Sequence, residues 1–567
     1  MTESKIKIDF LPAALTLGVS ICGLFLFLGS CAKVFPPGGG PEDKKPPEIL
    51  SVQPSPGSVN VGTESTLEIV FNKTMKENET QKAIFISPIS FNYPEYKWSG
   101  KKLKIVIPEK LKERATYVIT VGASAKDIRN NSLGKSRSYA FSTGDIIHSG
   151  TISGKILSGG LRSIDVWAYK LVFAPDSFVY HIPDYITQSD SLGDFKFEYL
   201  SDGSYLVVAV DDRNKDQFWT PPSEKLALPD RLVNLEGDLN TYAGLVMVTA
   251  ERDTLKPFFS KVTAPGNRQL LIEFSQKMID SSVINLANYR LSSLEDTSAQ
   301  IKIDRAYPIW GENNKYAFDI DTMVSGKKYK LQAFGLISEY ETRSETLSQT
   351  FNCGAADSIR PAITQILPTP DKELLPSDLE FTIGFSRSMD TSMTRAAATV
   401  TDTFKQSISC IYEWDYPNRL KITPQVEPGN SYLLTIDQKK LRDQAGVSIG
   451  DSLSTYSFRT APIDTFGQIS GRIVGGNMET YVIARSTGND TSIVPCGGDG
   501  RFMVDYLLPF TYYLSAFYDR DGNGRYSPGK TKPLQFSEPL TTYADSVLVR
   551  SRWETDIGSI DFEHISD

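Results

Sequence analysis

The sequence is poor in the residues on which most enzyme active sites depend. Among its 567 residues there are three histidines, His148, His181 and His564, and five cysteines. Metal-dependent hydrolysis, Ser-His-Asp catalysis and Cys-His catalysis therefore lack a convincing general base. No Gly-rich phosphate-binding loop is present. We predict a protein without enzymatic activity, although residue counts leave open a glycosidase, which needs only two suitably spaced carboxylates.

Cysteine is too scarce for a fold stabilised by disulfides. Cys22 and Cys31 lie near the N-terminus, which leaves Cys353, Cys410 and Cys496 in the body of the chain. Disulfide-dependent domains are much richer in cysteine than this. We expect these three side chains to be small buried hydrophobic groups. A Cys353–Cys410 disulfide is the alternative, but nothing in the pattern brings the two residues together.

Positive charge is not concentrated anywhere in the chain. Lys and Arg number 60 against 68 Asp and Glu, giving a net charge of -8. Nucleic-acid binding needs clustered Lys and Arg, so we predict no nucleic-acid partner. The length is too great for one core and indicates several domains. Frequent Gly, Pro, Tyr and Phe favour strands and turns over helices.

The N-terminus has the layout of an export signal. Lys5 and Lys7 precede an apolar run over residues 10–28, which is long enough that a spanning helix must be considered. The run ends in Leu-Gly-Ser-Cys at 28–31 and continues into Pro and Gly, without a basic stop-transfer cluster. These four residues match the bacterial lipobox, so residues 1–30 resemble a lipoprotein signal peptide. The resemblance implies that Cys31 becomes the mature N-terminus and carries a lipid, whereas the alternative is an uncleaved helix.

Residues 31–47 form the lipidated cysteine and a segment of Pro, Gly and charge that cannot build a core. We interpret this segment as a tether between the membrane and the first folded module. The alternative is that its Pro-Pro-Gly-Gly-Gly-Pro run lies ordered along a partner protein.

A pattern of about a hundred residues occurs three times. Each copy opens with an aspartate four positions before a proline, continues to an apolar-x-Phe-(Asn/Ser)-x-x-Met element, and then has a tyrosine-led strand and an aromatic strand. The Phe and Met of the three elements are Phe71 and Met75, Phe274 and Met278, and Phe385 and Met389. Short alternating runs bounded by Pro and Gly are typical of β-sandwiches. We expect the Phe residues in the core and the Met residues at its edge; a Met-aromatic ligand site is the alternative.

The tyrosine that leads the next strand follows a polar turn, as a corner tyrosine does in immunoglobulin-like domains. These residues are Tyr117, Tyr329 and Tyr432. The repeat resembles the bacterial Ig-like modules of surface-layer proteins and of Bacteroidota lipoproteins, in which Phe-(Ser/Asn)-x-x-Met-Asp is characteristic. Met389-Asp390 matches that element fully, while Lys76 and Ile279 depart from it. The resemblance implies fold more than function, because sandwiches host unrelated activities.

A second pattern of about ninety residues occurs twice. Its copies begin Gly-Thr-Ile-Ser-Gly-Lys-Ile at 150–156 and Gly-Gln-Ile-Ser-Gly-Arg-Ile at 467–473, and each runs through a tyrosine-led strand into an acidic loop. This unit resembles the carboxypeptidase-regulatory-like or transthyretin-like β-sandwich, a module often used for spacing or docking. We therefore predict an all-β chain of five small sandwiches, three Ig-like and two regulatory-like, behind the signal peptide. The predicted domains are Ig-like 48–146, regulatory-like 147–250, Ig-like 251–355, Ig-like 356–463 and regulatory-like 464–567.

The two acidic loops contain the only pattern with metal-binding character. Their oxygen side chains stand at positions one, three and five, as in the first half of a calcium loop: Asp519, Asp521 and Asn523, and, as the weaker candidate, Asp212, Asn214 and Asp216. Lys530 and Ser223 occupy position twelve, where an EF-hand has a bidentate glutamate, so the full signature fails. The alternative is a tight turn in which Asp and Asn accept backbone N–H groups. We expect bound calcium, if present, to stiffen a hairpin.

These features predict a lipid-anchored, non-enzymatic interaction or scaffold protein of a Gram-negative outer membrane. The chain resembles Bacteroidota lipoproteins with Ig-like modules behind a Cys-Ala-x-x-x-x-Pro-x-Gly-Gly motif, which here begins at Cys31. Some such lipoproteins are thought to be accessory subunits of outer-membrane β-barrels, including the barrel-assembly machinery, so a barrel or envelope complex is the expected partner. In Bacteroidota lipoproteins, acidic residues shortly after the cysteine act as a signal for export to the cell surface. Here the first acidic residues, Glu42 and Asp43, come late, so both the periplasmic face and the cell surface stay open.

The alternative function is that of a surface lipoprotein that binds or degrades glycans. Exposed aromatic side chains can stack on sugars, although tryptophans in sandwiches are usually part of the core. The candidate residues for such stacking are Trp98, Trp219, Trp310, Trp414 and Trp553.

Overall fold

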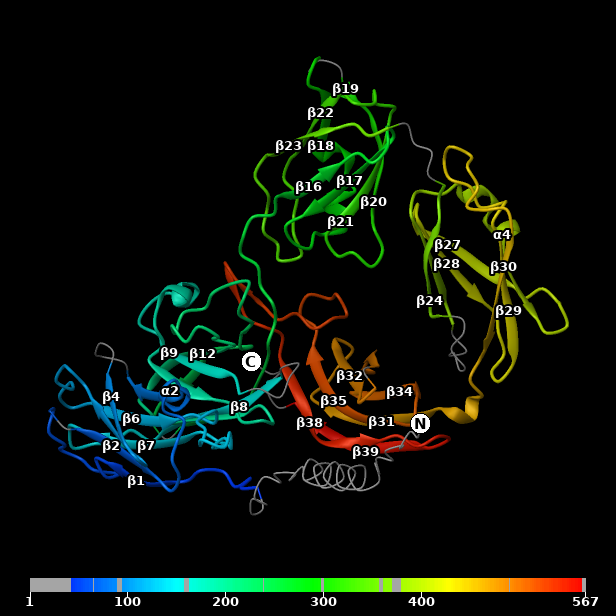
Figure 1. The fold of residues 1–567 in the computed structure, drawn as a ribbon. Helices are drawn as coiled ribbons and strands as arrows, with labels where there is room; N and C mark the ends of the chain where they lie inside the picture. The colour runs from blue at the N-terminus through cyan, green and yellow to red at the C-terminus, as the bar shows by residue number, and fades with distance from the viewer. Residues whose placement is uncertain are drawn as a thin grey trace, which may run out of the picture.

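A computed structural model of the protein describes residues 42–64, 66–88, 94–157, 163–237, 239–296, 300–355, 360–369, 379–488 and 490–562. The predicted signal peptide and the predicted lipidation site Cys31 lie outside the described residues. The predicted fold class is confirmed: the described chain is built from small β-sheets that pair into sandwiches (Figure 1). We call the five sandwiches modules 1 to 5 in chain order.

The helices of the described chain are short. They are α2 (Glu77–Gln81), α3 (Asp280–Val283), α4 (Thr394–Ala397), and the 3-10 turns η1 (Pro175–Tyr180), η2 (Leu286–Asn288), η3 (Thr391–Met393) and η4 (Ile463–Thr465). None of them has the length and apolar character needed to cross a membrane.

Modules 1, 3 and 4 share one plan, in which a four-stranded antiparallel sheet packs against a second sheet of three or four strands. In module 1 the sheets are β1-β2-β5-β4 and β3-β6-β7, formed by β1 (Ile49–Gln53), β2 (Leu67–Phe71), β3 (Ile84–Ser87), β4 (Glu95–Ser99), β5 (Lys102–Val106), β6 (Thr116–Val121) and β7 (Arg137–Ser142). The alternation of buried and half-exposed residues along β2 places its odd positions in the core, as a strand with one solvated face requires.

Module 3 has the sheets β16-β17-β21-β20 and β19-β18-β22-β23, formed by β16 (Phe259–Thr263), β17 (Gln269–Phe274), β18 (Tyr289–Ser293), β19 (Gln300–Ile301), β20 (Ile303–Pro308), β21 (Lys315–Ile320), β22 (Lys328–Ala333) and β23 (Leu347–Asn352). Module 4 has the sheets β24-β25-β28-β27 and β26-β29-β30, formed by β24 (Ile363–Leu367), β25 (Phe381–Phe385), β26 (Ala398–Asp402), β27 (Cys410–Tyr416), β28 (Arg419–Pro424), β29 (Ser431–Asp437) and β30 (Leu453–Arg459).

The Phe-(Asn/Ser)-x-x-Met element follows the second strand of each of these modules and ties three parts of the module together. The core assignments are confirmed, because the three Phe and three Met side chains are at most 2% exposed. Each Met forms an isolated β-bridge with a distant loop, at Asp127, Ser338 and Asp443 respectively.

The Asn or Ser of the same element explains the proline that opens each copy. Its side-chain oxygen accepts the N–H of the residue directly after that proline: Glu48 to Asn72 at 2.8 Å, Phe258 to Ser275 at 3.1 Å and Ala362 to Ser386 at 3.0 Å. The two halves of the motif, 17 to 24 residues apart in sequence, are therefore one hydrogen-bonded unit that fixes where each module begins.

The predicted corner tyrosines are confirmed in all three copies. The hydroxyls of Tyr117, Tyr329 and Tyr432 accept the backbone N–H five residues upstream, at 2.8, 2.8 and 2.7 Å. Because the ring is buried and the hydroxyl meets a backbone donor, each tyrosine joins the core to the preceding turn.

Modules 2 and 5 share a different plan. In module 2 the sheets are β10-β9-β12-β13, with β14 also paired to β12, and β11-β8-β15, formed by β8 (Gly150–Leu157), β9 (Asp165–Lys170), β10 (Tyr185–Gln188), β11 (Asp194–Leu200), β12 (Gly203–Val210), β13 (Leu226–Ala227), β14 (Val233–Leu235) and β15 (Thr241–Val248). In module 5 they are β33-β32-β35-β38 and β34-β31-β39, formed by β31 (Gly467–Val474), β32 (Thr480–Ser486), β33 (Thr491–Pro495), β34 (Arg501–Leu507), β35 (Thr511–Tyr518), β38 (Leu540–Leu548) and β39 (Glu554–Asp561). In both, the last strand pairs in parallel with the first.

Each module has a hydrophobic core of its own, but the modules are not strung in a line. In Figure 1 the chain turns back after modules 3 and 4, so that module 5 lies beside module 2. Val246 of β15 forms one buried cluster with Phe517 of β35 and Leu540 of β38. The repeats predict a row of modules; in the structure this row folds back on itself, so that module 5 contacts module 2 and the chain is closed.

Candidate functional site

The acidic loop of module 5 follows β35 and is organised around one buried carboxylate. Asp519 is 5% exposed. Its Oδ1 accepts the N–H of Gly522 at 2.8 Å and of Asn523 at 3.2 Å, and its Oδ2 accepts the N–H of Gly524 at 2.7 Å. Gly522 and Gly524 have φ values of +72° and +70°, which glycine adopts without strain. Burial by itself raises the pKa of Asp519, but the three N–H groups outweigh it, so the pKa lies below its usual value.

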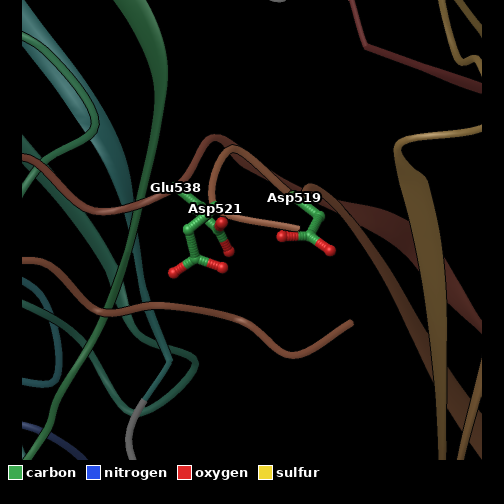
Figure 2. Close-up of side chains that lie close together, drawn as sticks. All are labelled: Asp519, Asp521 and Glu538. Carbon is green, nitrogen blue, oxygen red and sulfur yellow. The ribbon is translucent and has the colours of Figure 1, made fainter. Parts of the chain in front are cut away.

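Figure 2 shows that a third carboxylate joins Asp519 and Asp521. It belongs to Glu538, which is 3% exposed and follows Asp519 by nineteen positions. Carboxylate oxygens of Asp519, Asp521 and Glu538 all lie within 4.8 Å of one another. Burial, together with the charges of Asp521 and Asp519, raises the pKa of Glu538, which shows the cost of placing three anions together.

The oxygen of Asn523, the third residue predicted from the sequence, serves the loop itself. Its Oδ1 accepts the N–H of Arg525 at 2.6 Å, and its Nδ2 donates to Ser527 Oγ at 3.2 Å. Glu538 is likewise held by backbone groups, since it accepts the N–H of Arg520 and of Ser527, both at 2.8 Å. The loop is thus a preformed turn with three carboxylates, a set of ligands suited to a hard divalent cation.

The acidic loop of module 2 has the same frame, an aspartate and a glutamate that accept backbone N–H groups, but its other side chains differ. Asp212 accepts the N–H of Lys215 at 2.6 Å and of Gln217 at 3.2 Å. Glu224 accepts the N–H of Arg213 at 3.0 Å and of Thr220 at 2.9 Å, as Glu538 does in module 5. The other two predicted residues pair with each other, because Asn214 Nδ2 donates to Asp216 Oδ2 at 2.8 Å.

The acidic loop of module 2 contains a positively charged side chain. Lys215 stands where module 5 has Gly522, and its Nζ lies 2.7 Å from Oδ2 of the buried Asp165. Burial raises the pKa of Asp212 to about 6, and the positive charge of Lys215 opposes that rise. The structure therefore separates the two candidates: the loop of module 2 already contains an ammonium group, and that of module 5 has glycine there.

The two glutamates were not among the residues predicted from the sequence. They lie outside the one-three-five spacing of a calcium loop, and the distance from the first aspartate differs between the copies. A signal for them does exist, because both copies contain Ser-Glu-x-Leu, at 223–226 and 537–540, directly before the strand that follows the loop. That shared tetrapeptide, rather than position twelve, marks the last acidic residue.

The cysteines and tryptophans take mostly structural places. All three body cysteines are free, so a Cys353–Cys410 disulfide is not formed; Cys353 and Cys496 are buried as expected, while Cys410 is only half-buried. Burial raises the pKa of each thiol. Of the five candidate tryptophans, only Trp553 is exposed, with 68% of its surface accessible.

The other four tryptophans are packed against the protein. Trp219 is 8% exposed, and Trp98 and Trp414 stack on the core rings of Phe71 and Phe385. Trp310 of module 3 covers Gly384 of module 4 so closely that a Cβ there would lie 2.4 Å from its ring.

Comparison with protein families identifies two of the modules. Residues 43–143 and 357–460 match the model of the bacterial Ig-like domain. Modules 1 and 4 are bacterial Ig-like domains. Module 3 repeats their strand plan, corner tyrosine and Phe-Ser-x-x-Met element without matching that family model, and the match covers about a third of the chain. No curated protein matches the chain.

Solved structures that are similar to parts of this chain include surface-layer proteins and an L,D-transpeptidase. The N-terminal part of the bacterial S-layer protein SbsC is 13% identical over 36% of this chain and 44% of its own length, with a TM-score of 0.18. Domains 1–6 of surface layer protein SbsC are 10% identical over 95% of this chain and 70% of theirs, with a TM-score of 0.17. L,D-transpeptidase 3 from Mycobacterium tuberculosis is 14% identical over 24% of this chain and 45% of its own, with a TM-score of 0.14.

Proposed function

We propose that this protein is a non-enzymatic interaction or scaffold protein of the cell envelope, anchored to the outer membrane by a lipid on Cys31. The observation that carries the proposal is the lipobox at 28–31, which stands directly ahead of a chain of β-sandwiches that includes two bacterial Ig-like domains. Each described sandwich fills its own interior with apolar side chains, so its outer surface and loops are what it offers to other molecules.

The expected partner is an outer-membrane β-barrel or a complex built on one, such as the barrel-assembly machinery. Modules 2 and 5 contact each other although they are not consecutive in the chain. Such a contact suits a role as a rigid accessory subunit. The Pro/Gly segment behind Cys31 then either spaces module 1 from the membrane or contacts the partner.

The anchor is tested by replacing the lipidated cysteine. Cys31→Ala should move the protein from the membrane fraction to the soluble fraction, and Cys22→Ala, which alters a cysteine inside the signal segment, should leave it in the membrane. Unchanged fractionation of Cys31→Ala would reject lipid anchoring. Protease treatment of intact cells then distinguishes the cell surface, where the modules are cleaved, from the periplasmic face, where they are protected.

The partner is tested by purifying the tagged protein from detergent-solubilised membranes. Stoichiometric recovery of an outer-membrane barrel supports the scaffold role. Recovery of the protein alone, in several detergents and after cross-linking in cells, would count against it.

We further propose that the loop of module 5 binds calcium through Asp519, Asp521 and Glu538. Two observations support the proposal. Three carboxylate oxygens lie within 4.8 Å of one another, and the loop has Gly522 where the loop of module 2 has Lys215. Bound calcium would hold the two ends of the loop together and would take no part in catalysis.

A second candidate function is glycan binding, and the exposure of Trp553 favours it. Its indole stands in the turn between β38 and β39 and offers a stacking surface for a sugar ring. Retention of the protein on polysaccharide columns, abolished by Trp553→Ala and preserved in Trp310→Phe, would support this function over the scaffold role.

A further inference from the structure

The acidic loops of modules 2 and 5 differ in length at one place only. In both, a glutamate accepts two backbone N–H groups, from the residue after the first aspartate and from the residue eight positions after that aspartate. Thr220 and Glu224 are four positions apart, whereas Ser527 and Glu538 are eleven positions apart. Module 5 therefore has seven additional residues between two points that are otherwise equivalent.

The additional residues form a small hairpin. Its strands are β36 (Lys530–Thr531) and β37 (Leu534–Gln535), and Glu538 holds its base closed through the N–H of Ser527. None of residues 528–537 belongs to the core cluster of module 5. The hairpin thus projects from the module without contributing to that core.

The hairpin makes apolar contacts with module 2. Leu534 and Phe536 pack against the buried aromatic cluster on the outer side of β9 and β12, which includes Trp167, Tyr169 and Trp219. At the edge of this contact the ammonium of Lys532 donates to the hydroxyl of Tyr180 and lies 4.6 Å from the centre of its ring. The backbone N–H of Ser537 also donates to the carbonyl of Pro229 at 2.9 Å.

The hairpin also grips the chain where module 2 leads into module 3. The guanidinium of Arg252, only 9% exposed, donates to the carbonyls of Gly529 at 2.5 Å and Pro528 at 2.6 Å. Lys530 forms an ion pair with Glu341 of module 3 at 2.5 Å. One short insertion therefore contacts module 2, the connection to module 3, and module 3 itself.

We propose that residues 528–537 are a docking hairpin that holds module 5 against module 2 and thereby fixes the direction in which the Ig-like modules 3 and 4 project. The insertion is absent from the matching loop of module 2, and it carries the polar and apolar contacts described above. The smaller contact of Val246 with Phe517 and Leu540 is buried beside it and completes the same interface. Closing the chain in this way removes the freedom that single-strand connections between modules otherwise leave.

The test is chemical cross-linking in the full chain. Cysteines at Tyr180 and Lys532, whose side-chain ends contact each other across the interface, should be joined by a flexible bismaleimide reagent, and each single-cysteine variant should not be. Adding Leu534→Asp and Phe536→Asp should lower the cross-link yield at least tenfold, because two carboxylates cannot remain in the aromatic cluster. Leu548→Asp, an exposed apolar residue of the same module, is the matched control and should leave the yield unchanged.

A second variant removes the hairpin without adding charge. Deleting residues 529–535 leaves Ser527 and Glu538 four positions apart, as Thr220 and Glu224 are in module 2. Spin labels on the exposed Lys196 and Arg501 should then show a broad distance distribution in place of a narrow one, with the melting transition of module 5 retained. An unchanged narrow distribution would overturn the proposal, and so would unfolding of module 5 in both variants, because its core would then depend on the hairpin.

Discussion

At the scale of single residues, the corner tyrosines show how one side chain joins the core to a turn. Each of Tyr117, Tyr329 and Tyr432 places its ring in a core and its hydroxyl against a backbone N–H that the strands do not use. Leaving a buried N–H without an acceptor costs more free energy of folding than the hydrogen bond itself contributes. Removal of the tyrosine hydroxyl should therefore lower the stability of the module.

Tyr432→Phe should therefore destabilise module 4 by about 1 kcal/mol without changing its fold, since the ring stays and the N–H of Glu427 loses its acceptor. The measurement is the denaturation midpoint of the module 4 transition. Tyr456→Phe in β30 is the matched control, because the described structure records no hydrogen bond for that hydroxyl. Equal midpoints for Tyr432→Phe and the native chain would show that water satisfies the N–H instead.

Asp212 predicts a pH dependence at the same scale. Its pKa is raised from 3.8 to about 6 in the folded protein, so the native state binds this proton more tightly than the unfolded state. The contribution of Asp212 to stability is therefore fully present below the unfolded pKa and is lost as the pH rises through the folded pKa, by at most about 3 kcal/mol.

Asp212→Asn should consequently gain stability relative to the native chain as the pH rises from about 4 to about 7. The measurement is the free energy of unfolding of module 2 followed by tryptophan fluorescence, since Trp167 and Trp219 are buried there. Asp194→Asn on an exposed strand of the same module should show no such trend. A constant difference across this pH range would mean that Asp212 has an ordinary pKa.

At the scale of elements, the two acidic loops show one frame used for two purposes. A buried aspartate, a turn with two residues at positive φ and a distant glutamate recur in both, but the loop of module 2 also contains Lys215, whose ammonium pairs with the buried Asp165. In module 5 three carboxylates remain within 4.8 Å. Like charges at this separation repel, and a divalent cation is one way to offset that repulsion.

Calcium should raise the melting temperature of module 5 in the full chain, and EDTA should reverse the rise. Glu538→Gln and Asp521→Asn should each abolish the calcium-dependent part, whatever they do to the melting temperature in EDTA. Asp216→Asn in the loop of module 2 is the control and should leave the calcium response intact. A calcium response that survives in Asp521→Asn with Glu538→Gln would place the ion elsewhere.

At the scale of the whole molecule, the interfaces between modules differ in chemistry. The contact of modules 2 and 5 includes buried apolar clusters besides its hydrogen bonds, whereas that of modules 3 and 4 consists of hydrogen bonds and the packing of Trp310 on Gly384. Asp280 accepts the hydroxyls of Tyr316 and Tyr416, both at 2.6 Å, and Asn418 Nδ2 donates to the carbonyl of Pro308 at 3.0 Å. Beside this contact lies a polar cleft of about 260 Å³ lined by residues of both modules. Because polar contacts beside water exchange easily, we expect this interface to act as the hinge of the chain.

Tyr416→Phe should loosen that hinge while leaving modules 3 and 4 folded, because it removes one hydrogen bond to a carboxylate, an interaction of about 1.5–3 kcal/mol. The distance distribution between labels at Lys261 and Lys439 should broaden. Tyr412→Phe, whose hydroxyl donates within module 4 to Ala398, is the matched control. Identical distributions would show that the bend between the modules is set elsewhere.

The sequence by itself determined the modules. Repeated Phe, Met and Tyr positions state which side chains enter each core, and local alternation states which residues form strands, so the fold class, the core residues and the corner tyrosines could be predicted. Two of the three carboxylates of the acidic site could be predicted too, because Asp519 and Asp521 are neighbours in sequence. These properties depend on contacts within about a hundred residues.

Only the tertiary structure decided how the modules meet. Glu538 reaches Asp519 because a hairpin leaves the loop and returns, and the loop composition does not state where it returns. The contact of Leu534 and Phe536 with module 2 joins residues some three hundred positions apart, and two apolar side chains in a hairpin have no periodicity that names their partner. Burial of this kind follows from shape and position in three dimensions. For that reason the repeats predicted a row of sandwiches, while the folded chain is closed.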